Sequence, residues 1–307
     1  MNIDIAVLLC TYNGEKYLCT QLDSILKQKD VNVTLFVRDD GSSDETCDII
    51  NRYKTQYPDK VVLVDNMNKN LGPGLGFMKL FFKVFKEYKR FSFYAFADQD
   101  DIWLDNKLYE GIKKIGDVLS PVLYCSDLWI YQNNRICGLK YGNTKNISLQ
   151  EQLIRNELNG CTFIMNNDLA STLYNTGMPN RYLLNIRNHD AWIALVTILV
   201  GKIVLDSNAY IHYRIHTNNT VGLRTKISLV KRKEKFGKIF PYHKIWRINA
   251  EELNKRIKAK SKDKAVLNMF MDYTKNLKSR IRFYNYIKEY SDDSKPVLFI
   301  KILLGYP

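Results

Sequence analysis

Apolar runs of strand length alternate with stretches of helical periodicity in the N-terminal part of the chain. Residues 5–9 are continuously apolar, which is the pattern of a strand covered on both faces. Leu18, Leu22 and Ile25 then recur at helical spacing. The same alternation predicts further strands at 31–37, 60–64 and 91–97, and helices through 47–53 and 77–85.

Strands that alternate with helices predict an α/β fold with a mostly parallel sheet flanked by helices. Farther along, 122–131, 161–165 and 203–216 have strand patterns, and 188–200 has the pattern of a buried helix. Ligands of such sheets bind beyond the carboxyl ends of the strands. Three polar clusters fall there, and we expect them to line one crevice: 11–13 (TYN), 39–40 (DD) and 98–101 (DQDD).

The acidic cluster at 98–101 is a candidate metal site. If the strand before it continues, Asp98 and Asp100 lie on one face. Two carboxylates, with a ligand diphosphate supplying more oxygens, suit Mg²⁺ or Mn²⁺. The alternative is a solvated acidic loop in which Asp101 or Asp105 caps the helix that starts near Asn106. Its position after an apolar strand, aligned with two other polar strand ends, favours the metal.

The other clusters permit ligand contacts and simpler roles. Asp39 and Asp40 can accept hydrogen bonds from a nucleotide base or ribose, and Gly41 allows close backbone approach. The alternative there is a turn, with Ser43 or Asp44 capping the next helix. The glycine-rich stretch at 72–76 lacks the lysine and the spacing of a phosphate loop, so it predicts a plain turn.

Two later segments carry further candidate chemistry. Asp190 opens an apolar helix, where it is either a general base or a simple cap. Strand alternation places His212, Arg214 and His216 on one face. That face suits a diphosphate and its metal, and the alternative is the solvent side of an edge strand.

Composition limits the class of protein. The chain has 307 residues, 46% of them hydrophobic, which is ample for a core. It contains no apolar stretch of spanning length and no signal-peptide pattern, so we expect a cytoplasmic protein. The six cysteines show no C-x-x-C pair and no cluster with the histidines, which predicts reduced thiols and no zinc site.

The formal net charge of +14 falls entirely within residues 224–307. Basic residues there are interleaved with apolar ones, notably at 267–273 and 297–304, which favours helices lying on an anionic bilayer. The alternative is a helical extension packed on the catalytic domain or on a second subunit, so a homo-oligomer stays open. No nucleic-acid motif accompanies the charge, so we expect no nucleic-acid partner.

Taken together, the motifs at 11–14, 39–44, 98–103, 188–192 and 213–216 resemble the ordered set of family 2 inverting glycosyltransferases. The resemblance covers roughly residues 3–222, and it implies the Rossmann-like GT-A fold followed by a basic helical extension over 224–307. The D-Q-D-D-x-W form, 159–162 and 217–219 are most similar to bacterial rhamnosyltransferases of polysaccharide assembly. Ala191 and Ile215 depart from that pattern, since those relatives often carry Trp and Gln there.

The resemblance also implies roles for individual residues. It implies a nucleotide site at Thr11, Tyr12, Asn13, Asp39 and Asp40, with Asp98 and Asp100 around the metal and the diphosphate. It implies that Asp190 is the catalytic base, that His189, Trp192 and Gly160 are its acceptor-side neighbours, and that Arg214 and His216 belong to a phosphate-side closing segment in which His216 also approaches the metal.

The expected function is metal-dependent, inverting transfer of a sugar from a nucleotide-sugar donor, with L-rhamnose from dTDP-rhamnose as the first choice. The expected acceptor is a lipid-linked saccharide of a bacterial surface polysaccharide, met at the inner membrane face. One alternative is the same chemistry with a UDP-hexose. The other is a non-catalytic nucleotide-sugar or polyanion-binding protein.

Overall fold

The computed structural model describes residues 3–64, 70–142, 147–216 and 245–305. By its contacts the chain divides into two compact units. The first contains Met1–Asn146 and Leu158–His216, and the second contains Ile147–Glu157 and Thr217–Pro307. The predicted boundary between 223 and 224 lies outside the described residues. The short segment 147–157 groups with the C-terminal unit, which the sequence did not indicate.

The first unit starts with the predicted alternation of strands and helices. The strands are β1 (Asp4–Thr11), β2 (Asn32–Asp39), β3 (Val61–Leu63) and β4 (Phe93–Ala97), and the helices between them are α1 (Glu15–Leu26), α2 (Thr46–Gln56) and α3 (Pro73–Glu87). These strands pair in parallel in the order β3-β2-β1-β4. The carboxyl ends of β1 and β2 are in register, with Thr11 opposite Asp39, so their polar ends meet.

The second half of the sheet is mixed. Its strands are β5 (Ile102–Trp103), β6 (Val122–Gln132), β7 (Arg135–Leu139), β8 (Ile164–Asn166) and β9 (Lys202–Arg214), and its helices are α4 (Lys107–Ile115), α6 (Asn167–Thr176) and α7 (Arg181–Val200). β8 is antiparallel to β4 and β6, whereas β9 is parallel to β6. The strand expected at 161–165 is in part wrong, because Gly160–Thr162 forms a 3-10 turn before β8. Within the described ranges the strands form one nine-stranded sheet.

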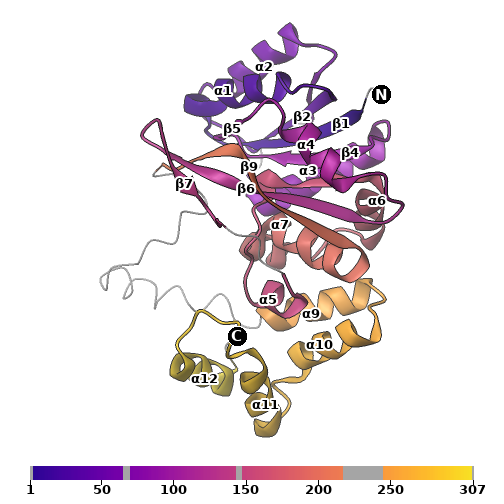
Figure 1. The fold of residues 1–307 in the computed structure, drawn as a ribbon, viewed down its shortest axis with the longest axis vertical. Helices are drawn as coiled ribbons and strands as arrows, with labels where there is room; N and C mark the ends of the chain where they lie inside the picture. The colour runs from indigo at the N-terminus through magenta and orange to yellow at the C-terminus, as the bar shows by residue number, and fades with distance from the viewer. Residues whose placement is uncertain (1–2, 65–69, 143–146, 217–244, 306–307) are drawn as a thin grey trace. The chain divides into compact units, whose positions relative to one another are not determined.

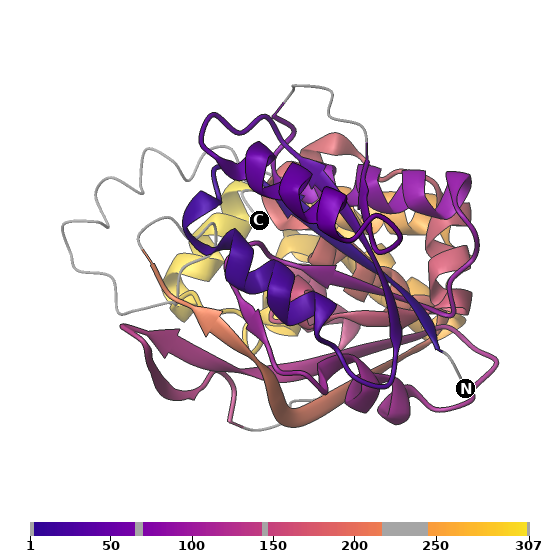
Figure 2. The same ribbon diagram turned by 90° about the horizontal axis from the view of Figure 1, so that it is seen from above.

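Helices cover both faces of this sheet (Figure 1, Figure 2). Alternate residues of β1, such as Ile5 and Val7, pack with apolar side chains of α1, α2 and α4 in one core cluster. The other face is covered by α3, α6 and α7. α3 starts with the plain turn that was predicted, since Gly72 has φ 74° and Pro73 occupies the first turn.

Helix α7 lies very close to α3. A Cβ atom on Gly74 would come within 2.1 Å of the Leu184 carbonyl oxygen, so only glycine fits. α7 is kinked at Asn188, whose φ of 61° and ψ of 176° are not helical. The helix predicted at 188–200 is therefore the second half of α7, which restarts directly before Asp190.

The second unit is helical, as expected for the extension. It contains α5 (Leu149–Ile154), α9 (Ile245–Arg256), α10 (Ser261–Asp272), α11 (Leu277–Ile287) and α12 (Lys295–Leu304). The indole nitrogen of Trp246 donates to the Ile154 carbonyl oxygen at 3.0 Å, which ties α9 to α5. None of the helices in the described ranges has both the length and the apolar character that crossing a membrane requires.

This unit has its own apolar core. Buried residues from four helices contribute to it, namely Leu253, Leu267, Phe270, Phe283, Leu298 and Ile302. Some of the apolar side chains of 267–273 and 297–304 are thus buried in this core. Those side chains are not available for the lipid contact that the sequence suggested for them.

Candidate active site

Asp39 anchors the ends of β1 and β2. Its carboxylate accepts hydrogen bonds from the Thr11 hydroxyl at 2.9 Å and from the backbone N–H groups of Gly41 and Ser42 at 3.0 and 2.8 Å. Burial acts to raise the pKa of Asp39, but the hydrogen bonds from Ser42 and Thr11 outweigh it and lower the pKa below its usual value. Asp39 is therefore ionised and rigidly held where the predicted nucleotide site begins.

The loop after β1 is tied to the loop after β4. The Tyr12 N–H donates to Gln99 Oε1 at 2.8 Å, and Gln99 Nε2 donates back to the Tyr12 carbonyl oxygen at 3.0 Å. Asn13 Oδ1 accepts from the Ser43 N–H at 2.8 Å. These bonds fix the backbone, while the Tyr12 side chain remains 49% exposed and open to a ligand.

Asp40 has structural partners. It accepts from the Arg38 guanidinium at 3.1 Å and from the backbone N–H groups of Leu71 and Gly72 at 2.7 and 2.8 Å. Asp40 thereby fixes the segment that leads into α3. Its contact with a nucleotide stays a prediction.

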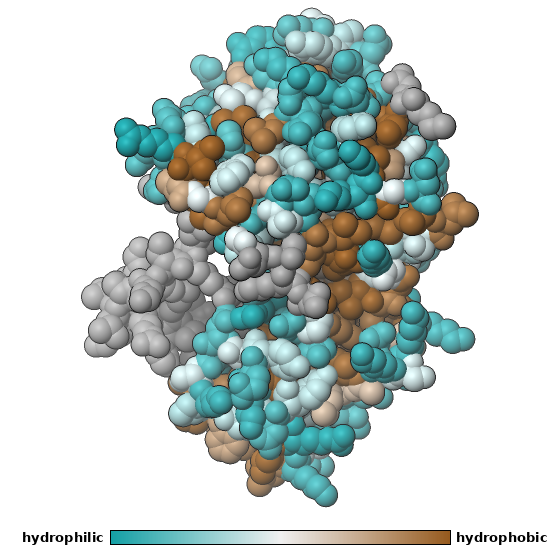
Figure 3. All heavy atoms as spheres, in the orientation of Figure 1, coloured by the Kyte–Doolittle hydropathy of each residue, from teal (hydrophilic) through white to brown (hydrophobic). Residues whose placement is uncertain are grey.

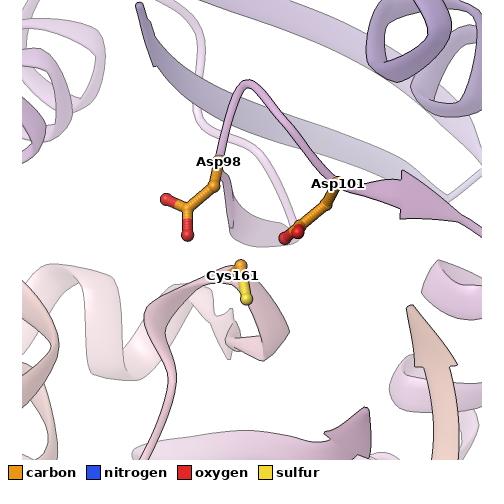
Figure 4. Close-up of side chains that lie close together, drawn as sticks. All are labelled: Asp98, Asp101 and Cys161. Carbon is orange, nitrogen blue, oxygen red and sulfur yellow. The ribbon is translucent and has the colours of Figure 1, made fainter. Parts of the chain in front are cut away.

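The acidic segment after β4 is a turn. β4 ends at Ala97, so the condition under which Asp98 and Asp100 would share a strand face is not met. Instead, Asp98, Asp101 and Cys161 lie close together, and their ligand atoms are within 4.8 Å of one another (Figure 4). Asp101 does not cap α4, because Asn106 occupies the N-cap position.

Negative charge is concentrated in this turn. Burial, followed by the charges of Asp100 and Asp190, raises the pKa of Asp98 to about 7. Burial and the charges of Asp100 and Asp98 also raise the pKa of Asp101, which is fully buried and has one carboxylate oxygen, Oδ2, without a hydrogen-bond partner among the described residues. Clustered carboxylates with an unpartnered buried oxygen fit a divalent cation, which prefers oxygen ligands and would offset their repulsion.

Arg214 and His216 close on the same turn. His216 Nε2 lies 2.7 Å from Asp100 Oδ2, and Arg214 Nε donates to the Asp100 carbonyl oxygen at 2.9 Å. Both side chains also pack on Tyr17, with the guanidinium 4.6 Å and the imidazole 4.9 Å from its ring centre. His212 stacks on Tyr131 instead, at 5.4 Å.

The neighbours of β9 test the edge-strand alternative. β9 lies between β6 and β5, so the edge-strand alternative is wrong for His212 and Arg214. His216 lies beyond β9, which ends at Arg214 and not at the predicted 216. The continuation at 217–219 lies outside the described residues.

Asp190 follows the kink in α7. Its Oδ1 accepts from the Ala191 N–H at 2.8 Å, so the carboxylate interacts with the first turn of the restarted helix. The approach of the 160–162 turn is very tight. A Cβ on Gly160 would lie 2.7 Å from His189 Nε2 and 3.2 Å from Asp190 Cβ.

His189 and Trp192 are buried supports of this helix. His189 lies against Phe77 and Phe96, with ring centres 4.3 and 5.1 Å away, and burial lowers its pKa to about 3. Within the described part of the chain, its two ring nitrogens and the Trp192 indole nitrogen have no hydrogen-bond partner. The imidazole is therefore neutral and packs beside Asp190.

Lys140 is a site residue that the sequence did not reveal. Its Nζ donates to Asn159 Oδ1 at 2.6 Å, next to Gly160. Its charge counteracts the rise in the pKa of Asp98, and Asp190 in turn counteracts the burial that lowers the pKa of Lys140. A single lysine just after the β6–β7 hairpin carries no sequence signal, because only the fold brings it between these carboxylates.

Solved structures share this architecture at low sequence identity. TarS from S. aureus, in complex with UDP, is 16% identical, with a TM-score of 0.58 over 99% of this chain and 88% of that chain. The mannosyltransferase PcManGT from Pyrobaculum calidifontis, in complex with GDP-Man and Mn²⁺, is 13% identical, with a TM-score of 0.54 over 99% and 80%. The fold is therefore the expected GT-A class.

Sequence comparison gives the family. The sequence model of glycosyl transferase family 2 matches residues 6–167, which is more than half of the chain. The chain belongs to this family.

Two curated relatives differ in their donors. The dTDP-rhamnosyl transferase RfbG of Shigella flexneri is 25% identical over 70% of this chain and 73% of its own. The Escherichia coli enzyme WfgD, a UDP-Glc:alpha-D-GlcNAc-diphosphoundecaprenol beta-1,3-glucosyltransferase, is 30% identical over 56% and 62%.

Proposed function

We propose that the protein transfers a sugar from a nucleotide-sugar donor to an acceptor hydroxyl with inversion at the anomeric carbon. The observation that carries this proposal is the placement of Asp190. It lies near enough to the acidic turn for its charge to raise the pKa of Asp98. A carboxylate beside the proposed diphosphate site can accept the proton of an attacking hydroxyl, while no second carboxylate nucleophile is required.

The remaining residues divide between donor and acceptor. Thr11, Tyr12, Asn13 and Asp39 bind the nucleoside, with Asp40 fixing the neighbouring loop. Arg214 and His216 bind the phosphate side. His189, Trp192 and Gly160 hold Asp190 in place from the acceptor side.

The acidic turn would hold Mn²⁺ or Mg²⁺. Asp98 and Asp100 are the proposed ligands, and Asp101 adds an unpartnered buried oxygen beside them. His216 is adjacent through its contact with Asp100. A bound divalent cation neutralises charge on a departing diphosphate.

The first choice of donor is dTDP-rhamnose, supported by the likeness to the rhamnosyl transferase RfbG. A UDP-hexose is the alternative, supported by the likeness to the glucosyltransferase WfgD. The proposed acceptor is a lipid-linked saccharide at the inner membrane face, reached through peripheral contact by the C-terminal unit.

The test is thermal stabilisation by a panel of nucleotide sugars with and without Mn²⁺ or Mg²⁺, because a ligand that binds only the folded state raises its stability. A metal-dependent shift with dTDP-rhamnose, lost in Asp100→Ala, supports the proposal. A shift only with UDP-hexoses changes the donor and keeps the reaction. If no nucleotide gives a metal-dependent shift, the transferase proposal is wrong.

A further inference from the structure

An apolar stripe on α12 is uncovered within the second unit. Val297, Ile300 and Leu304 are 45%, 56% and 61% exposed. Their spacing places them on one side of the helix. Leu298 and Ile302, on the opposite side, are buried in the core of the unit. The helix is therefore fixed by one apolar side and presents a second one to the solvent.

The neighbouring helix α11 has the same character. Leu277 and Ile281 are one turn apart and are 62% and 42% exposed. The Arg280 guanidinium donates to the Leu303 carbonyl oxygen, so the first turn of α11 adjoins the last turn of α12. Leu277 and Ile281, at this end of α11, therefore lie near Ile300 and Leu304, at the end of α12.

These two helices hold five of the eleven large hydrophobic side chains that are exposed in the described part of the chain. In Figure 3, hydrophobic side chains reach the surface among hydrophilic ones in the region that α11 and α12 form. Solitary exposed hydrophobic residues need no explanation, but a cluster on adjacent helices marks an interaction surface.

The charge beside this cluster is positive. Lys278 and Arg282 are exposed and follow Leu277 and Ile281 along α11, and neither α11 nor α12 contains an acidic residue. We name Leu277, Lys278, Ile281, Arg282, Val297, Ile300 and Leu304 the α11–α12 face.

The acidic residues between these helices are already paired. Glu289 lies 3.1 Å from Lys295, Asp293 lies 2.7 Å from Lys301, and Asp292 pairs with Arg155. They therefore do little to neutralise Lys278 and Arg282.

The combination of exposed apolar and basic side chains favours a bilayer over a second copy of the chain as the partner of this face. Two copies meeting through this face about a two-fold axis would bring the same basic residues together, which is unfavourable. An anionic bilayer satisfies both features, because apolar side chains enter the boundary of headgroups and acyl chains while cations contact lipid phosphates.

We propose that the α11–α12 face binds the surface of an anionic phospholipid bilayer. This inference deepens the peripheral membrane contact of the proposed function and gives it particular residues. It is narrower than the sequence interpretation, because the buried apolar residues of the unit take no part in it.

The experiment is co-sedimentation of the full chain with vesicles, without donor or acceptor. One vesicle preparation contains phosphatidylglycerol mixed with phosphatidylcholine, and the other contains phosphatidylcholine alone. The wild-type chain is expected to bind the first and to bind the second weakly. Ile300→Gln with Leu304→Gln keeps helix propensity and should weaken binding at least about tenfold.

The charge is tested by Lys278→Gln with Arg282→Gln. Each lost cation should weaken binding roughly fivefold, from about 1 kcal/mol per basic residue near the surface. The matched control is Lys262→Gln with Lys264→Gln, which removes the same charge from exposed positions on α10 and should change binding much less.

If Lys278→Gln with Arg282→Gln weakens vesicle binding no more than the control variant does, the assignment of this face is wrong. It is also wrong if Ile300→Gln with Leu304→Gln leaves vesicle binding unchanged. If the wild-type chain binds neither vesicle preparation but forms a dimer that Ile300→Gln with Leu304→Gln abolishes, a second copy of the chain occupies the face. Vesicle binding needs no nucleotide, so it can fail or succeed independently of the nucleotide-sugar panel.

Discussion

Gly160 determines how closely the 160–162 turn approaches Asp190. Alanine at this position would place Cβ 2.7 Å from His189 Nε2, so the buried imidazole, the helix or the turn must shift. We expect Gly160→Ala to lose about 1–3 kcal/mol of stability. Turnover should fall roughly a hundredfold, because small displacements of a catalytic group are costly. Urea unfolding and initial rates measure both effects.

Gly76→Ala is the matched control. A Cβ there would meet Cys10 Sγ at 3.6 Å, an ordinary contact, inside α3. That variant should be as stable as the wild type or gain up to about 1 kcal/mol. If Gly160→Ala behaves like Gly76→Ala, the tight approach does not position Asp190.

Lys140 supplies positive charge between the acidic turn and Asp190. Removing it in Lys140→Met favours the protonated forms of nearby carboxyl groups, so their pKa values rise. The acidic limb of kcat/KM against pH should then move to higher pH, because the base becomes ionised only at higher pH. The control is Lys113→Met, an exposed residue of α4. An acidic limb that stays at the same pH in both variants would show that Lys140 does not influence the ionisation of the base.

Among the helices, α7 is kinked at Asn188, and this kink sets the position of His189 and Asp190, which follow it. Asn188 has φ 61° and ψ 176°, a region that residues other than glycine adopt at a cost of about 1–3 kcal/mol. Asn188→Gly should therefore be at least as stable as the wild type. Asn188→Val should lower the thermal midpoint, because a branched side chain tolerates this conformation least. Equal midpoints for glycine and valine would mean that the kink is not strained.

The sequence predicted the elements that depend on local pattern. Apolar runs located β1 to β4, and the parallel register of β1 and β2 brought Thr11 and Asp39 together as expected. The strand predicted at 91–97 does end at Ala97, but the condition that it continue through Asp98 and Asp100 is not met, and local pattern does not show how the chain turns after a strand. Asp101, Cys161 and Lys140 therefore entered the site only through the fold.

At the scale of the whole molecule, His189 couples stability to pH. Its pKa is lowered to about 3 in the folded chain, against about 6.5 when unfolded. Between these values the unfolded state binds a proton that the folded state does not. Stability is therefore lost as pH falls from about 6.5 toward 3, by up to about 1.4 kcal/mol per pH unit from this group.

The variant His189→Phe removes this coupling. Its free energy of unfolding, measured in urea at several pH values, should decline less steeply between pH 6.5 and 4 than that of the wild type. Parallel curves for the two proteins would show that folding does not lower the pKa of His189.

The charge of the molecule is also divided between its parts. The net charge of +14 is confined to residues 224–307, whereas the sheet unit carries the acidic turn and Asp190. The proposed chemistry therefore depends on the first unit, and the proposed bilayer contact on the second. Substitutions in the first unit should leave vesicle binding unchanged, and substitutions in the α11–α12 face should leave nucleotide-sugar binding unchanged.

The role of Asp190 is tested by comparing Asp190→Asn with the wild type in turnover and in metal-dependent nucleotide-sugar binding. We expect a loss of turnover of about 10²- to 10⁴-fold with donor binding retained, because only proton transfer is removed. Asp168→Asn, another carboxylate in the first turn of a helix, should leave both unchanged. Turnover by Asp190→Asn within a few fold of the wild type would contradict the claim that Asp190 is the general base.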